Sequence, residues 1–192
     1  MFAAVLDTCV LWPSLQRDFI LSMAIEGLYR PLWSDAILAE LHRHEVLKLE
    51  RRGADPDEAA ERADHLINQM RRYFDDALVI GWDGLDGTYG LPDPDDEHVV
   101  AAAVVGGAGA IVTDNVKDFP AEVVPSHLQI LSAQEFAANT ADVDPSRAAQ
   151  ALQVLARRHQ RPPRTAAELL DLLVRRYQMT EVGEILAPVI EP

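Results

Sequence analysis

Several side chains with carboxylate or amide oxygens follow predicted strands in this 192-residue chain. Asp7 comes directly after the apolar run Phe2–Leu6, which predicts a buried strand. A second polar group follows the predicted strand at residues 110–113 and consists of Asp114, Asn115 and Asp118. The carboxyl ends of parallel strands meet at one edge of a sheet, where ligands bind. We therefore expect Asp7 and the later group to share that edge.

Two further acids lie on predicted helices. Asp96 falls in the first turn of a helix that Asp93 and Pro94 open as N-cap and first residue. Asp96 shares a helix face with the apolar positions 99, 100 and 103, which must face the sheet, so we place it at the sheet edge above the core. Glu40 follows Ile37 by three residues and borders the apolar stripe of its own helix. Four carboxylates from distant segments thus converge at one rim.

Such a cluster is suited to a divalent cation. Hard oxygen ligands favour Mg²⁺ or Mn²⁺, and a bound ion neutralises phosphodiester charge and lowers the pKa of a coordinated water. Two ions are also compatible with the cluster. We expect Asp7 and Asp96 to bind the ion directly, Glu40 and Asp118 to act directly or through water, and Asn115 to orient a ligand or a water.

Each of these residues also has an ordinary structural interpretation. Asp7 and Asp118 are compatible with turn acids, Glu40 with a helix surface, and Asp96 with a helix N3 acid that interacts with the macrodipole. His98 follows Asp96 by two positions, so we expect it to point elsewhere and to be structural. Cys9, the one cysteine of the sequence, is expected to be a small buried filler, and it excludes an intrachain disulfide.

The net charge of −14 is unusual for an enzyme that acts on nucleic acid, because phosphates are repelled. The charge is uneven: residues 1–145 carry −16, and residues 146–192 carry +2. A bound cation reverses the local sign, so the acidity does not exclude RNA, and it favours a basic partner protein. No apolar run is long enough to cross a bilayer, and the N-terminus lacks a basic region, so we expect no secretory signal, no membrane association and a cytoplasmic location.

The order of elements predicts an α/β fold with a mainly parallel sheet covered on both faces. Strands are expected at residues 2–6, 29–33, 77–80, 110–113 and 128–131. Helices are expected at residues 12–27, 35–52, 57–74, 93–105 and 133–139, with Ser34 as an N-cap and Asp55 or Asp57 at the next helix start. A hinge at residues 142–145 separates a domain at 1–140 from a helical extension at 141–192.

Four segments of the sequence together resemble a PIN domain, most closely the VapC toxins of bacterial toxin–antitoxin pairs. The resemblance covers about residues 2–138 and rests on the order and spacing of the segments. They are Val5–Leu11, which holds the first acid; Trp33–Leu41, which holds the second; Asp93–Ala103, which holds the third; and Ile111–Phe119, with its Thr-x-Asn-x-Lys-Asp-Phe pattern.

The resemblance implies a three-layer α/β/α fold, Mg²⁺- or Mn²⁺-dependent endoribonuclease activity on RNA, neutralisation by a small antitoxin, and pairing into a homodimer. The acids of the family carry over to Asp7, Glu40 and Asp96. Its later acidic position falls on Asn115, which cannot supply the charge of an Asp. Which of Asp114, Asn115 and Asp118 reaches the ion therefore stays open.

Two other classes of protein are compatible with the acidic cluster. A phospho-accepting receiver module also gathers acids and Mg²⁺ at a sheet edge, and Lys117 fits its lysine, but no acidic pair precedes Asp7. A catalytically inactive PIN adaptor would bind only a partner.

The residues after 145 predict helices at about 145–159, 165–178 and 180–186. They share an apolar face that includes Leu152, Leu155, Leu169, Leu172, Leu173 and Tyr177. This face is compatible with a lid, with an antitoxin-binding surface, or with simple packing.

Overall fold

The computed structural model describes residues 1–158 and 162–190. The predicted end of a helix at His159 lies outside the described residues. The chain divides into two compact units. We call residues 3–12 and 31–130 the sheet unit, and residues 1–2, 13–30 and 131–192 the helical unit.

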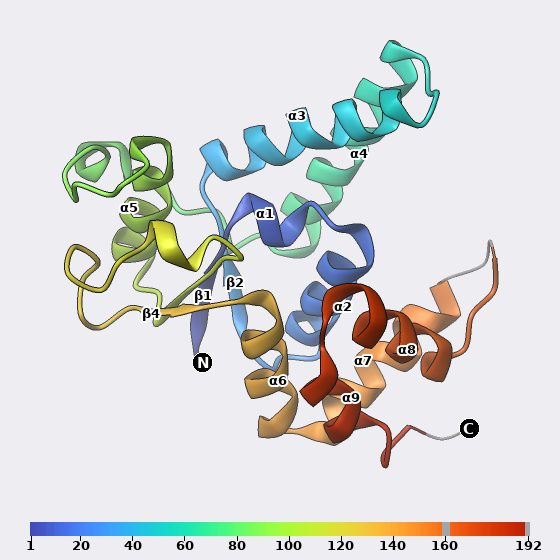
Figure 1. Ribbon diagram of the computed structural model, residues 1–192. Helices are drawn as coiled ribbons and strands as arrows, with labels where there is room; N and C mark the ends of the chain where they lie inside the picture. Colours follow the sequence, from blue (N-terminus) through green and yellow to red (C-terminus); the bar gives the residue numbers. More distant parts are fainter. Residues whose placement is uncertain (159–161, 191–192) are drawn as a thin grey trace. The chain divides into compact units, whose positions relative to one another are not determined.

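The sheet contains four strands, all parallel, in the order β2-β1-β3-β4 (Figure 1). Their bounds are β1 Ala3–Leu6, β2 Arg30–Leu32, β3 Ala110–Val112 and β4 Gln129–Leu131. In the central pair, Ala4 is opposite Ala110 and Leu6 is opposite Val112. Helices flank this sheet, so the α/β fold with a mainly parallel sheet and C-terminal helices is confirmed.

The central strands β1 and β3 end side by side, and this sets the position of Asp7. The backbone N–H of Asp7 donates to the carbonyl of Val112 at 3.0 Å, directly after the last paired residues. Every residue of β3 is buried, as expected for a strand covered on both faces. The predicted shared edge therefore exists at this pair of strands.

Side-chain caps fix the starts of the helices of the sheet unit. The Ser34 hydroxyl accepts from the backbone N–H of Ile37 at 3.1 Å, and Asp55 accepts from that of Asp57 at 3.0 Å, as predicted for N-caps. Helices α3 and α4, which follow these caps, lie side by side (Figure 1). The helices of this unit are α1 Thr8–Leu11, α3 Asp35–Arg51, α4 Pro56–Tyr73 and α5 Glu97–Gly106, with 3-10 turns η1 Asp83–Leu85, η2 Pro94–Asp96 and η3 Val116–Asp118.

Helix α5 packs against both central strands and ends at glycines. A Cβ at Gly106 would lie 2.8 Å from Val79 and 3.0 Å from Leu32, so a larger residue would force the packing apart. Gly107 has a φ of 64° and stops the helix in the left-handed conformation. The helix predicted to end at about residue 105 therefore ends one residue later, at Gly106.

The helical unit is built from five helices over the described residues. They are α2 Ser14–Ile25, α6 Ala133–Val143, α7 Pro145–Arg158, α8 Ala166–Tyr177 and α9 Thr180–Leu186. Capping boxes start two of them, at Ser132 with Glu135 and at Thr165 with Glu168. Leu152, Leu169 and Leu173 are completely buried. The predicted apolar face of the C-terminal helices therefore packs within the unit at these positions.

Three predicted elements differ from the structure. The predicted strand at residues 77–80 is wrong: only an isolated bridge joins Leu78 to Trp33, and Ile80 is 77% exposed. The helix predicted at residues 12–27 is α2 Ser14–Ile25, which starts two residues later because Pro13 takes an extended conformation before it. Helix α6 also runs through Val143, so the predicted hinge is shortened to a break at Asp144.

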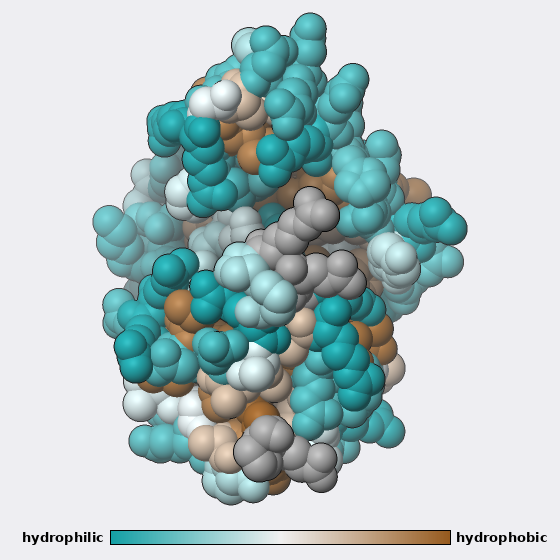
Figure 2. All heavy atoms as spheres, turned by 90° about the vertical axis from the view of Figure 1, so that its right-hand side faces the viewer, coloured by the Kyte–Doolittle hydropathy of each residue, from teal (hydrophilic) through white to brown (hydrophobic). Residues whose placement is uncertain are grey.

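No helix within the described ranges is long and apolar enough to cross a membrane. Figure 2 shows one face of the molecule, on which hydrophilic side chains predominate and hydrophobic residues occur in small patches. This agrees with a chain in which a quarter of the residues are charged.

Candidate active site

A pocket of about 430 Å³ opens in the sheet unit. It brings together side chains from four separated segments, including four of the five site residues predicted from the sequence. The lining residues are Asp7, Thr8, Cys9, Trp12, Glu40, His44, Leu47, Arg51, Asp96 and Asn115. The predicted convergence of distant oxygens at one place is therefore present in the geometry.

Asp7 lines the pocket and is only 5% exposed. Its Oδ2 accepts a hydrogen bond from the Thr113 hydroxyl at 2.7 Å and one from the Cys9 thiol at 3.1 Å. Among the described residues, no donor reaches Oδ1, which leaves this oxygen for a ligand in the pocket. Asp7 follows β1 with an extended backbone, and its side chain makes no cap hydrogen bond to α1.

Cys9 supports Asp7 and is more than a filler. Burial first, and then the nearby Asp7 carboxylate, raise the pKa of the Cys9 thiol to about 12. The thiol therefore stays protonated and can donate to Asp7. Its sulfur also accepts from the backbone N–H of Asp114 at 3.2 Å, which ties the loop after β3 to α1.

Glu40 has three neighbours that stabilise its charge: Thr8, His98 and Arg43, whose guanidinium lies 3.7 Å from its Oε1. The Thr8 hydroxyl donates to its Oε2 at 2.9 Å, and the ring Nε2 of His98 lies 3.6 Å from its Oε1, a separation typical of an ion pair rather than a hydrogen bond. Interaction with the His98 ring, together with the Thr8 hydrogen bond, lowers the pKa of Glu40 although burial opposes this. Glu40 is therefore ionised and fixed in the pocket.

His98, which was expected to point elsewhere than Asp96 and to be structural, contacts a different acid of the site, Glu40. Its ring faces Glu40 because residues 94–96 form a 3-10 turn, which breaks the helical spacing between positions 96 and 98. Burial lowers the pKa of His98, but the Glu40 carboxylate outweighs this and raises it. His98 packs on Trp82 with ring centroids 5.9 Å apart, and the Trp82 indole N–H donates to Asp35 at 3.0 Å.

Asp96 is the most strongly perturbed acid of the site. Burial, followed by the negative charges of Asp7, Asp93 and Asp118, raises its pKa from 3.8 to about 6. It stands at the N-cap of α5, but its side chain makes no cap hydrogen bond. Its carboxylate is therefore not used in capping, while the alternative of an acid that interacts with the helix macrodipole stays open.

The three residues after β3, Asp114, Asn115 and Asp118, differ in how they relate to the pocket. Asn115 lines the pocket, and its backbone N–H donates to the Thr113 hydroxyl at 3.1 Å. Asp118 is not in the lining, yet it is close enough for its charge to raise the pKa of Asp96. The side chain of Asp114 is exposed. Asn115 thus lines the pocket and Asp118 lies near Asp96, and which of the three residues reaches an ion stays a prediction.

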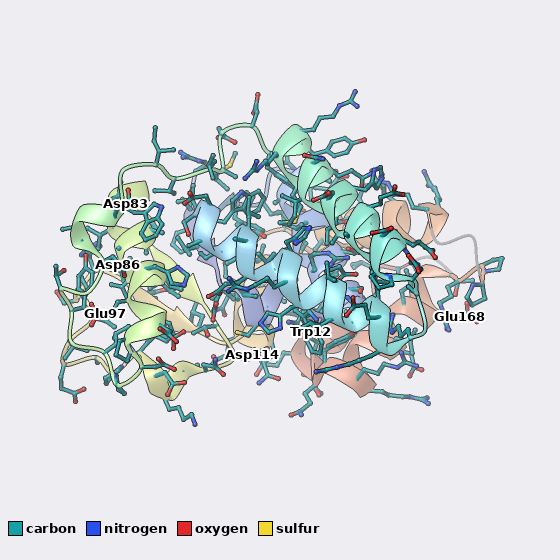
Figure 3. The ribbon with its side chains drawn as sticks, turned by 90° about the horizontal axis from the view of Figure 1, so that it is seen from above. Trp12, Asp83, Asp86, Glu97, Asp114 and Glu168 are labelled. Carbon is teal, nitrogen blue, oxygen red and sulfur yellow. The ribbon has the colours of Figure 1, made fainter. Side chains whose placement is uncertain are left out.

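A buried carboxylate holds the loop that precedes Asp96. Glu97, labelled in Figure 3, accepts hydrogen bonds from three consecutive backbone N–H groups, those of Tyr89, Gly90 and Leu91, at 2.7–3.1 Å. Its side chain is only 4% exposed. This clamp fixes the start of α5 and therefore the position of the neighbouring Asp96.

The donor set is chemically suited to a divalent cation but is not closed around one. Over the residues that the structure describes, no three His, Cys, Asp or Glu side chains stand close enough together to hold a single ion. Burial is the first cause of the raised pKa of Asp96, and the negative charges of the neighbouring acids raise it further. A cation that draws them inward would remove this repulsion, so the residues fit Mg²⁺ or Mn²⁺ with several retained waters.

Sequence reasoning missed three supporting residues: Thr8, Thr113 and His98. Each touches an acid, and the two threonines directly follow Asp7 and the apolar run of β3. A hydroxyl beside each strand-end acid was an available signal. The contact of His98 with Glu40 depends on the 3-10 turn at residues 94–96, and no pattern in the sequence indicated it.

Comparison with protein families agrees with this geometry. The model of the PIN domain matches residues 3–117, more than half of the chain, and the model of the VapC50 C-terminal domain matches residues 133–184. No curated protein and no solved structure matched. The chain therefore belongs to the PIN-domain family and is a VapC-type protein with a C-terminal helical region.

Proposed function

We propose that this VapC-type nuclease is an endoribonuclease that depends on Mg²⁺ or Mn²⁺ and acts as the toxin of a toxin–antitoxin pair. The observation that carries the proposal is the meeting of Asp7, Glu40 and Asp96, from three distant segments, in one pocket. Membership of the PIN family supports nuclease chemistry and removes the ground for a receiver module.

Asp7 and Asp96 are the proposed direct ligands of the cation. Thr113 and Cys9 donate to Oδ2 of Asp7, which leaves its Oδ1 available as a ligand. Glu40 and Asp118 act directly or through water, and Asn115 orients a ligand or a water. A bound divalent cation would neutralise the phosphodiester and make a coordinated water more acidic.

The protein's own groups supply the positioning. Thr8 and His98 hold Glu40 as an ionised acceptor, suited to take a proton or orient a water beside the phosphate. The protonated Cys9 keeps Asp7 in one rotamer. The Glu97 clamp fixes the segment that carries Asp96.

A small antitoxin is the proposed protein partner. The −16 charge of residues 1–145 would attract a basic segment of such a partner. Pairing of two copies and a cytoplasmic location stay predictions, which sedimentation and fractionation can check. The proposed boundary between residues 140 and 141 also stays a prediction, since the two compact units interleave along the chain.

Cleavage of total RNA by the purified chain with Mg²⁺, Mn²⁺ or EDTA tests the proposal. We expect cleavage with either ion and none with EDTA. Asp7→Asn should reduce the rate by about a thousand-fold, the equivalent of a loss of about 4 kcal/mol of transition-state stabilisation. The fold should persist because the amide oxygen can still accept from Thr113.

Asp95→Asn is the matched control, because Asp95 is exposed and outside the pocket lining. It should cleave like the parent chain. Equal rates for Asp7→Asn and Asp95→Asn would defeat the proposal. Failure of the parent chain to bind Mn²⁺ in calorimetry would instead favour the inactive adaptor.

A further inference from the structure

The pocket continues past the acids along two parallel helical segments. Thr8 donates to Glu40 at 2.9 Å, and four residues later the Trp12 indole N–H donates to the carbonyl of His44 at 3.3 Å. Both contacts join residues 32 apart, so α1 and α3 run in the same direction. The pocket therefore has an acid end at Asp7 and Glu40, and a second end beside Trp12.

One face of α3 lines the whole length of the pocket. Glu40, His44, Leu47 and Arg51 all line it, at spacings of four, three and four residues. A rise of 1.5 Å per residue places His44 about 6 Å and Arg51 about 16 Å from Glu40 along the axis. We call the group Trp12, His44, Leu47 and Arg51 the aromatic end.

Trp12 is exposed, yet several contacts hold it in place. Its side chain is 38% exposed, and its indole is anchored through the His44 carbonyl. Lys48 Nζ donates to the carbonyl of Trp12 at 3.3 Å and lies 5.9 Å from its ring centroid. The His44 ring stands edge-on at 6.3 Å (Figure 3, where Trp12 is labelled beside α3). A ring held in this way loses little entropy when a planar ligand stacks on it.

The aromatic end carries positive charge, unlike the acid end. Arg51 is exposed and forms no salt bridge within the part of the chain that the structure describes. Aromatic faces for bases with cations for phosphates are the usual components of sites for single-stranded nucleic acid. Leu47 is the one aliphatic side chain in the described lining, so this end of the pocket suits a planar ligand better than an apolar protein segment.

We propose that the aromatic end is a nucleotide subsite for single-stranded RNA. The base next to the scissile phosphate stacks on Trp12, whose ring His44 supports edge-on, and Arg51 meets a phosphate farther along the strand. This inference rests on the proposed function, because the acid end is what places a reacting phosphate in the pocket. Its content is the identity of the side chains beyond the acids that would hold the nucleotide beside the cut, namely Trp12 and Arg51.

The first test changes the RNA and leaves the protein untouched. A short single-stranded oligonucleotide that the chain cleaves is compared with copies carrying one abasic site at each position in turn. We expect one position beside the cut to lower kcat/KM by roughly ten-fold or more, with distant positions unchanged. A uniform response along the strand would overturn the subsite.

The second test measures RNA binding in an Asp7→Asn background, so that the strand stays intact. By anisotropy of a labelled single-stranded RNA, Trp12→Ala should weaken binding by roughly ten-fold or more, and Trp12→Phe should retain most of it. Tyr73→Ala is the matched control, because Tyr73 is an exposed ring of the sheet unit outside the pocket. Circular dichroism checks that the variants fold.

The third test isolates Arg51. Arg51→Ala should lower the slope of log Kd against log salt by about 0.7, the value for one phosphate contact on a single strand. Arg52→Ala, its exposed neighbour outside the pocket lining, should leave the slope unchanged.

The outcomes separate this inference from the proposed function. RNA cleavage that Trp12→Ala and the abasic sites leave intact refutes the subsite alone. RNA binding that needs Trp12, in a chain that never cleaves, refutes the nuclease alone. Unchanged RNA affinity with weakened binding of the co-purified partner protein would assign the aromatic end to that partner and overturn the subsite.

Discussion

The pocket of the sheet unit and the interior of the helical unit are stabilised in opposite ways. The pocket gathers Asp7, Glu40 and Asp96, whose charges repel one another. The helical unit buries leucines and alanines, which carry no charge and are stabilised by burial. Both units start their helices with side-chain caps, at Ser34 in one and at Ser132 in the other. The two units therefore start helices in the same way, and they differ in whether the side chains they gather are charged or apolar.

This contrast implies that the acids of the pocket lower the free energy of unfolding when no cation is bound, and that a bound cation would remove this destabilisation. A leucine of the helical unit adds stability under all conditions. An acid of the pocket adds to or subtracts from stability according to pH and cation. Three experiments sharpen or break the comparison, in order of decreasing effect.

The largest effect is expected in the helical unit. Leu152→Ala should lower the free energy of unfolding by about 2–5 kcal/mol, because Leu152 is completely buried in α7 and its loss leaves a cavity. Leu47→Ala, at a 46% exposed position, should change it by about 0.5 kcal/mol or less. Urea denaturation measures both. Equal losses would show that burial does not distinguish these two positions.

The second effect concerns the cation. Mn²⁺ at about 100 times its Kd should stabilise the parent chain by about 2.7 kcal/mol, since it binds the folded state and relieves repulsion among the acids. The stabilisation should vanish in Asp7→Asn and persist in Leu47→Ala. Thermal unfolding with and without EDTA provides the measurement. A stabilisation that Asp7→Asn retains would place the ion elsewhere.

The smallest effect is the pH dependence of Asp96. Its folded pKa, about 6, exceeds the unfolded value, so the folded chain binds the extra proton and loses stability as pH rises through this window. Without cation, Asp96→Asn should therefore be more stable than the parent at pH 7.5 by about 1 kcal/mol, after allowance for solvent screening at a partly exposed site. At pH 3.5 the two should match. An equal advantage at both values would mean that charge is not its source.

Much of the fold follows from local patterns in the sequence. Ser34, Asp55 and Asp93 cap helices as predicted, because a short polar side chain before an apolar run satisfies free backbone N–H groups. The prediction of a strand at residues 77–80 was wrong because a short apolar run does not reveal whether a neighbouring strand pairs along its length. There, only two backbone hydrogen bonds join it to Trp33.

The acids of the candidate site were predictable because strand ends and helix starts place them at one edge. The residues that hold these acids in place could not be predicted in this way. The contact of His98 with Glu40 depends on a 3-10 turn at residues 94–96, which helical spacing cannot anticipate. The bond from Cys9 to Asp7 depends on α1, a four-residue helix too short to show periodicity. The functional roles of all these residues stay predictions.

The proton on Cys9 has a practical consequence for chemical labelling. Alkylating reagents attack the thiolate, and a thiol with a pKa of about 12 contains almost none at neutral pH. Because Cys9 is the one cysteine of the sequence, a cysteine introduced on an exposed surface would accept a maleimide dye selectively, with the native sulfur left in place. Fluorescent reporters can therefore be attached to this chain without altering the residue that holds Asp7.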